Sequence, residues 1–187
     1  MNPTLIVALR ALRARQLFSI WLALALPTTL AQAQGDQPLV HEGIVNATPD
    51  QVWTAFTTKA GLESWMVAHA DVDLKLGGRM KTQYDPKGTT EDASAIANEF
   101  LSYEPQRMLS YRVVQAPVTF PFPDAIKKMW TVVYFEPQGD KTTRVRVVCL
   151  GFTADEQSQK MRAFFNRGNA LTLEHLQQRF APKSDTK

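Results

Sequence analysis

The segment VNATPDQVWTAFTTKAGLESWM, Val45–Met66, places a helix start directly after a strand-like run and decides the class of fold. Thr48 suits a helix N-cap, Pro49 the first helical position, and Asp50 the positive end of the helix dipole. The next apolar residues are spaced to form one stripe on a short helix: Val52, Trp53, Ala55 and Phe56. A second short helix is expected over Lys59–Trp65.

Strand-like runs lie on both sides of this segment. A first strand is expected over Leu39–Ala47, and Gly77-Gly78 is a turn signal. Three prolines predict an extended loop over Gln115–Ala125, because proline cannot join a regular strand ladder. The remaining strands are predicted over Val67–Leu76, Arg79–Tyr84, Ser94–Tyr103, Met108–Val114, Lys128–Glu136 and Thr142–Phe152. The pattern predicts an antiparallel sheet of about seven strands.

The end of the chain changes from a period of two to a period of 3.6 at Thr153, which predicts a helix of roughly 25 residues. Asp155 and Glu156 suit its first turn. One broad apolar face is expected, formed by Met161, Phe164, Phe165, Gly168, Leu171, Leu176 and Phe180. Strands followed by a long helix indicate an α+β fold with the helices on one face of the sheet.

Four segments together resemble the activator of heat-shock-protein ATPase homologue-like branch of the START/polyketide-cyclase (SRPBCC) superfamily. They are Val45–Met66, DVDLKLGGRM at Asp71–Met80, FLSYEPQRMLSYRV at Phe100–Val113, and FFNRGNALTLEHLQQRF at Phe164–Phe180. The resemblance implies a helix-grip (START-like) fold. In that fold a strongly bent antiparallel sheet wraps the long C-terminal helix and leaves a cavity between them.

The first 33 residues have the order of a secretory signal peptide: a basic start, an apolar run at Leu17–Leu26, and small residues at Ala31 and Ala33. The basic residues are Arg10, Arg13 and Arg15. A retained anchor is the alternative, but a spanning helix needs about 20 apolar residues. Cleavage after Ala33 would leave one domain, Gln34–Lys187, in the periplasm or outside the cell.

Removal of this leader changes the charge balance. The whole chain has 21 basic and 18 acidic residues, a net charge of +3. The leader contains three arginines and no acidic residue, so the remainder has 18 of each and no net charge. A neutral domain lacks the positive electrostatic field that attracts the negatively charged backbone of a nucleic acid. We therefore expect no nucleic-acid partner, and no stable membrane insertion after cleavage.

Residues with the spacing of a catalytic or metal site are scarce. His41, His69 and His175 lie on different predicted elements, and Cys149 is the single cysteine, in an apolar run that predicts burial. His69 is expected either at a cavity mouth or in a solvated turn, and His175 at the edge of the long helix. Glu99 and Arg112 are expected to point outward or to pair across strands. No catalytic residue, metal ligand or cofactor is predicted.

Aromatic and small residues supply the predicted ligand-binding set, because small-molecule pockets are mostly apolar. Phe120-Pro121-Phe122-Pro123 is the candidate lid, and a loop pinned to the surface by two rings is the alternative. Gly168 indicates either room for a ligand or close approach of another element. The full set is Trp65, Phe100, Tyr111, Phe120, Phe122, Trp130, Met161, Phe164, Phe165 and Gly168.

Three functions are compatible with these observations. The preferred one is an exported protein that binds a small hydrophobic molecule without catalysis. A cyclase- or dehydratase-like enzyme, as in the polyketide-cyclase relatives, would need a polar group buried in the cavity. A co-chaperone-like interaction module is suggested by the family name. Its ATPase partner is intracellular and needs ATP, so the leader argues against it, and the protein partner stays unknown.

Overall fold

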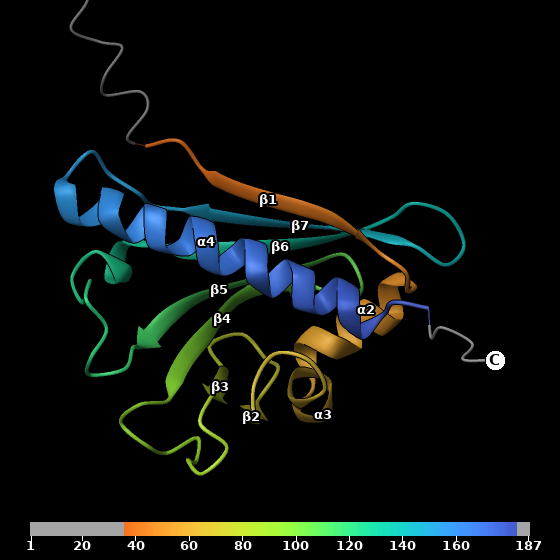
Figure 1. The fold of residues 1–187 in the computed structure, drawn as a ribbon, viewed down its shortest axis with the longest axis horizontal. Coiled ribbons are helices and arrows are strands. Elements are labelled where there is room, and N and C mark those ends of the chain that lie inside the picture. The colour runs from red at the N-terminus through yellow and green to blue at the C-terminus, as the bar shows by residue number, and fades with distance from the viewer. Residues whose placement is uncertain (1–35, 183–187) are drawn as a thin grey trace, which may run out of the picture.

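The computed structural model describes residues 36–182, which form one seven-stranded antiparallel sheet with helices against its concave face (Figure 1). The strand order is β1-β7-β6-β5-β4-β3-β2. The strands are β1 (Leu39–Val45), β2 (His69–Val72), β3 (Arg79–Gln83), β4 (Ile96–Glu104), β5 (Met108–Gln115), β6 (Trp130–Pro137) and β7 (Thr143–Leu150). The helices are α2 (Pro49–Thr57), α3 (Lys59–Glu63), α4 (Glu156–Arg179) and the 3-10 turn η1 (Ile126–Lys128). The α+β helix-grip prediction is confirmed, while the predicted leader lies outside the described residues.

Helix α2 begins as the sequence predicts. Thr48 Oγ1 accepts a hydrogen bond from the Gln51 amide at 3.3 Å, and Gln51 Oε1 accepts one from the Thr48 amide at 2.9 Å. This reciprocal capping box satisfies two backbone donors that the first helical turn leaves free. Val52 and Phe56 of the predicted stripe are buried against the sheet. The strand–cap–helix sequence therefore fixes where the chain leaves β1.

The apolar core is divided into two clusters. The larger cluster joins α2, α3 and the C-terminal half of α4 to the sheet and includes Phe100, Phe135 and Leu176. The smaller cluster surrounds the start of α4. Its members are Leu39, Ala125, Ile126, Met129, Cys149, Phe152 and Met161. Cys149 is 1% exposed, which confirms its predicted burial.

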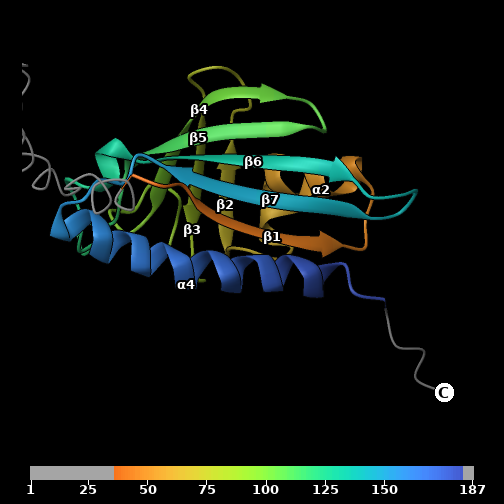
Figure 2. The ribbon, with the colours of Figure 1, turned by 90° about the horizontal axis from the view of Figure 1, so that it is seen from above.

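Helix α4 runs alongside β1, as Figure 2 shows from above. Near its start, Arg162 donates hydrogen bonds to the carbonyl groups of Gln37 and Pro38, and near its end, Gln177 Nε2 donates to the Ile44 carbonyl at 3.0 Å. These contacts attach the helix to the outer edge of the sheet. Within residues 36–182, no helix has the length and apolar character needed to cross a membrane.

The inward face of α4 differs from the predicted one. Phe164 and Leu171 are 43% and 57% exposed, and Gly168 is also exposed. The buried residues of the helix are Ser158, Met161, Leu173 and Leu176. Hydropathy alone misplaced the inward face of α4 because that face includes a polar residue. Half-buried Asn169 donates a hydrogen bond to Cys149 of the sheet, and this bond offsets the cost of burying its amide.

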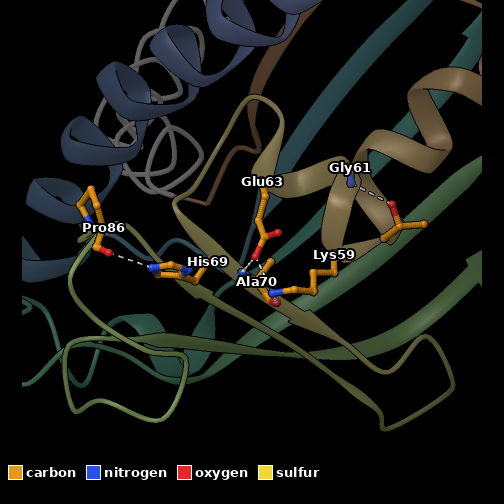
Figure 3. A network of polar contacts seen from close by, with 7 residues as sticks. Lys59, Gly61, Glu63, His69, Ala70 and Pro86 are labelled. Carbon is orange, nitrogen blue, oxygen red and sulfur yellow. Dashed lines mark hydrogen bonds and ion pairs between the residues drawn. The ribbon is translucent and has the colours of Figure 1, made fainter.

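The free edge of β2 is covered by side chains of α3 (Figure 3). Lys59 Nζ donates to the Ala70 carbonyl at 2.9 Å, and the Ala70 amide donates to Glu63 Oε1 at 2.9 Å. The hydrogen bond from Lys59, then that from the Ala70 amide, lowers the pKa of Glu63. Satisfied backbone groups at a sheet edge oppose pairing with another chain.

Polar contacts on the sheet show where His69 and the pair Glu99–Arg112 lie. His69 was expected at a cavity mouth or in a solvated turn. His69 belongs to β2, and its Nε2 lies 3.0 Å from the Pro86 carbonyl oxygen (Figure 3). Arg112 Nη2 donates to Glu99 Oε1 at 2.8 Å between β5 and β4, which confirms the cross-strand pair. These side chains are thus engaged in holding strands and loops together.

Candidate functional site

The structure distributes the predicted ligand-binding residues over several places. Phe100 is 1% exposed and fills the larger core cluster. Trp65 borders the same cluster: its ring centroid is 5.2 Å from that of Phe56, and its Nε1 donates to the Ala55 carbonyl at 3.1 Å. Met161 is buried in the smaller cluster. These three side chains pack the core at either end of the concave face.

Four of the predicted aromatic residues form one group of rings between α4 and the proline-rich loop. Their centroids are separated by 5.5 Å for Phe164–Phe165, 5.6 Å for Phe120–Phe122 and 5.8 Å for Phe120–Phe164. Such edge-to-face contacts add to the stabilisation that burial gives. The rings pin the loop onto α4, in agreement with the alternative to a lid.

Trp130 and Gly168 do not face the space between the sheet and α4. Thr131 and Val133 of β6 point to the concave side, so Trp130 points to the opposite face, where it is 38% exposed. A Cβ atom added at Gly168 would meet no atom within 4 Å. Gly168 is therefore not required by close packing.

A row of polar residues crosses the concave face where the two core clusters meet: Cys149 belongs to the smaller cluster and Tyr111 packs against the larger one. Tyr111, Thr131 and Cys149 stand side by side in register on β5, β6 and β7. His41 lies on the same face of β1, opposite Val147, and Asn169 faces them from α4. We name these residues the polar belt: His41, Tyr111, Thr131, Cys149 and Asn169.

Hydrogen bonds join most of the polar belt. Asn169 Nδ2 donates to Cys149 Sγ at 3.2 Å, and Thr131 Oγ1 lies 3.6 Å from the same sulfur, with Tyr111 next to Thr131 in register. Burial raises the pKa of both Tyr111 and Cys149. The phenol and the thiol are therefore protonated at neutral pH, and a protonated thiol is a poor nucleophile. The belt offers hydrogen bonds rather than a reactive anion.

His41 differs from the other members of the belt, because one nitrogen of its imidazole ring lacks a hydrogen bond within the described part of the chain. Its Nδ1 is buried and has no hydrogen-bond partner among the described residues. Sequence reasoning tested this histidine only for metal-ligand spacing. Its alternation with the inward residues Leu39 and Val45 would have placed it on the concave face. Within residues 36–182, no group of histidine, cysteine and carboxylate side chains is arranged to hold a metal ion.

A hollow of about 330 Å³ opens beside this face at the end of β3. It is lined by Glu63, Ser64, Trp65, Met66, Val67, Ala68 and Tyr84. Tyr84, which directly follows β3, forms part of this lining. A second hollow, of about 360 Å³, lies between β1 and the first half of α4, lined by Leu39, Gln159, Arg162, Ala163 and Asn166.

The sequence model described as "Activator of Hsp90 ATPase homolog 1-like protein" matches residues 46–181. The chain belongs to this family. The match begins just after β1 and ends just after α4, so it includes every described element except β1. Among curated proteins, none matches the sequence.

Solved structures show the same fold at low sequence identity. Protein MLL2253 from Mesorhizobium loti is 22% identical, with a TM-score of 0.60 over 76% of this chain and 96% of that one. The Aha1 dimer from Colwellia psychrerythraea is 17% identical, with a TM-score of 0.60 over 77% and 96% of the two chains. CalU16 from Micromonospora echinospora is 20% identical, with a TM-score of 0.56 over 79% and 78%. At such low sequence identities, the comparison with these three structures shows that they share the fold of this chain.

Proposed function

We propose that this chain is exported and binds a small hydrophobic molecule between α4 and the concave face of the sheet. The observation that carries the proposal is the interruption of the core between its two clusters. There Val113 and Val147 are only half-buried, although they point to the side that α4 covers. Among the strands, β1 makes the close contact with α4. The middle of the concave face, where Val113 and Val147 lie beside the polar belt, is thus only partly covered by the protein itself.

The hollow beside Tyr84 is the proposed entrance. Its volume of about 330 Å³ lies at the lower end of the range of small-molecule pockets, roughly 300–1,000 Å³. Trp65, Met66 and Val67 line it together with Glu63 and Ser64, so the lining is both apolar and polar. Such a lining suits an apolar body that carries a polar group.

Binding without catalysis explains the belt more simply than the two alternatives. The belt supplies the buried polar groups that a cyclase- or dehydratase-like enzyme requires, but it contains no carboxylate, and its thiol and phenol are held protonated. A co-chaperone role follows from the family name alone, and a shared fold does not carry function. Export would also separate the chain from an intracellular ATP-dependent partner.

Export is supported by the leader-like sequence Met1–Ala33. N-terminal sequencing of the protein from a periplasmic or secreted fraction is expected to begin at Gln34. An intact Met1 in protein confined to the cytoplasm would contradict the proposal of export. It would not affect the proposal of ligand binding, which has a separate test.

Ligand binding is tested by filling the entrance. Ala68 lines the hollow and is half-buried, so Ala68→Phe places a ring where the ligand would enter. We expect one molecule of 1-aminoanthracene, a neutral fluorescent apolar probe, to bind per protein. Ala68→Phe is expected to weaken this binding at least tenfold, as measured by fluorescence titration.

Ala163→Phe is the matched control, because Ala163 is exposed and lines the second hollow, which shares no residue with the proposed entrance. This variant adds the same ring to the surface and is expected to bind the probe as the unchanged protein does. Thermal unfolding by circular dichroism checks that both variants are folded. Absence of saturable binding, or equal loss of binding in both variants, would contradict the proposed site.

A further inference from the structure

We propose that the bound molecule carries an uncharged hydroxyl group, which forms a hydrogen bond with His41 in the polar belt. This inference rests on the proposed function and defines the chemistry of its ligand. The class is an apolar, ring-like or chain-like body with an alcohol or phenol group.

The contacts at the two ends of β1 place His41 under the middle of α4. Arg162 bonds the backbone just before β1, and Gln177 bonds Ile44 near its end. The intervening stretch of α4, which includes Asn169, therefore passes over His41. Since Asn169 bonds Cys149 on the neighbouring strand, the histidine lies at the β1 end of the polar belt.

The Nδ1 atom of His41 is a candidate for a hydrogen bond to a ligand, because it has no partner within residues 36–182. The other buried side-chain nitrogen and oxygen atoms of the described residues have hydrogen-bond partners, whereas His41 Nδ1 has none. A buried polar atom without a partner destabilises a fold, so such an atom needs a reason. A partner supplied by a ligand is a sufficient reason, and it would favour binding by removing the cost.

The surroundings select an uncharged partner. The polar belt contains no lysine, arginine, aspartate or glutamate, so it offers no counter-ion to a carboxylate or an ammonium group. Arg162, whose charge acts on Cys149, is bonded to the Pro38 carbonyl and stacked over the Phe152 ring. Moving an unpaired charge into this half-buried space would be strongly unfavourable.

A hydroxyl group is the smallest neutral group that suits imidazole in both of its tautomers. In neutral imidazole one ring nitrogen donates and the other accepts, and the tautomer decides which is which. A hydroxyl both donates and accepts, so it can bond Nδ1 in either tautomer. Because neighbouring side chains cover Nδ1, the ring must turn about its Cβ–Cγ bond to meet the ligand, a torsion with broad minima.

The test uses three naphthalene probes that share one body: 2-naphthol, 2-methylnaphthalene and 2-naphthoate. Isothermal titration calorimetry is expected to show that 2-naphthol binds about five- to tenfold more tightly than 2-methylnaphthalene, the gain of one neutral hydrogen bond. The charged 2-naphthoate is expected to bind most weakly. In His41→Phe, which keeps a ring but removes both nitrogens, 2-naphthol and 2-methylnaphthalene should bind equally.

Nitrogen-15 NMR of the unchanged protein gives an independent measurement if His41→Phe fails to fold. We expect the His41 Nδ1 signal to shift on addition of 2-naphthol and not on addition of 2-methylnaphthalene. If 2-methylnaphthalene binds as tightly as 2-naphthol and the Nδ1 signal does not move, the hydroxyl inference is wrong while the apolar site stands. If 2-naphthoate binds most tightly, the ligand is charged and the inference is also wrong. If none of the probes binds, the proposed function itself fails.

Discussion

Gly151→Ala is expected to lower the free energy of unfolding by about 3 kcal/mol or more, because two costs coincide at this position. The residue has a φ of +86°, a conformation that side chains with a Cβ rarely adopt. An added Cβ would also lie 1.9 Å from the Lys128 carbonyl oxygen, which is backbone and cannot rotate away. To relieve this clash, the end of β7 would have to move away from η1, which contains Lys128.

Chemical denaturation followed by circular dichroism measures this loss, and Gly168→Ala is the matched control. Gly168 lies in the middle of α4 with open space around it, so the same substitution removes a helix-destabilising glycine without a clash. We expect it to raise the free energy of unfolding by about 0.5–1 kcal/mol. Equal stability of the two variants would mean that the described geometry around Gly151 is wrong.

Local signals in the sequence predicted most of the fold. The Thr48-Pro49-Asp50 cap, the turn at Gly77-Gly78 and the alternation in β7 each report the conformation of a few neighbouring residues. The bent antiparallel sheet around the long helix followed from the family resemblance, whereas the strand order and the pairing of β1 with β7 were not predicted, since no local signal reports which distant strands meet. The predicted strand Val67–Leu76 shortens to His69–Val72, because the chain turns at Asp73–Gly78 to form its hairpin.

The candidate site was less predictable, because it depends on which face each side chain presents. Tyr111 was selected for its aromatic ring, and the structure places it in the polar belt. His41 was weighed only as a metal ligand and Asn169 only as part of the segment Phe164–Phe180, since each acquires its role from residues far along the chain. Trp130 was selected on size, although strand alternation directs it to the outer face.

Leu176→Ala is expected to cost about 2–5 kcal/mol of the free energy of unfolding, the range for truncating a fully buried leucine. Leu176 is 0% exposed and joins α4 to the larger core cluster. Domains of this size are stable by about 5–15 kcal/mol, so the substitution removes a large part of the total. Urea denaturation at neutral pH, with the slope of the transition checked for two-state behaviour, measures the loss.

Leu171→Ala provides the contrast that tests the orientation of α4. Both leucines belong to the apolar face predicted from the sequence, but in the structure Leu171 is 57% exposed and five residues from Leu176 along the same helix. The two substitutions change helix propensity equally, so the difference between them reports burial alone. Leu171→Ala is expected to change the free energy of unfolding by no more than about 0.5 kcal/mol. Comparable losses in both variants would show that α4 is rotated toward the predicted face. That rotation would turn Asn169 away from Cys149 and take apart the polar belt on which the hydroxyl inference depends.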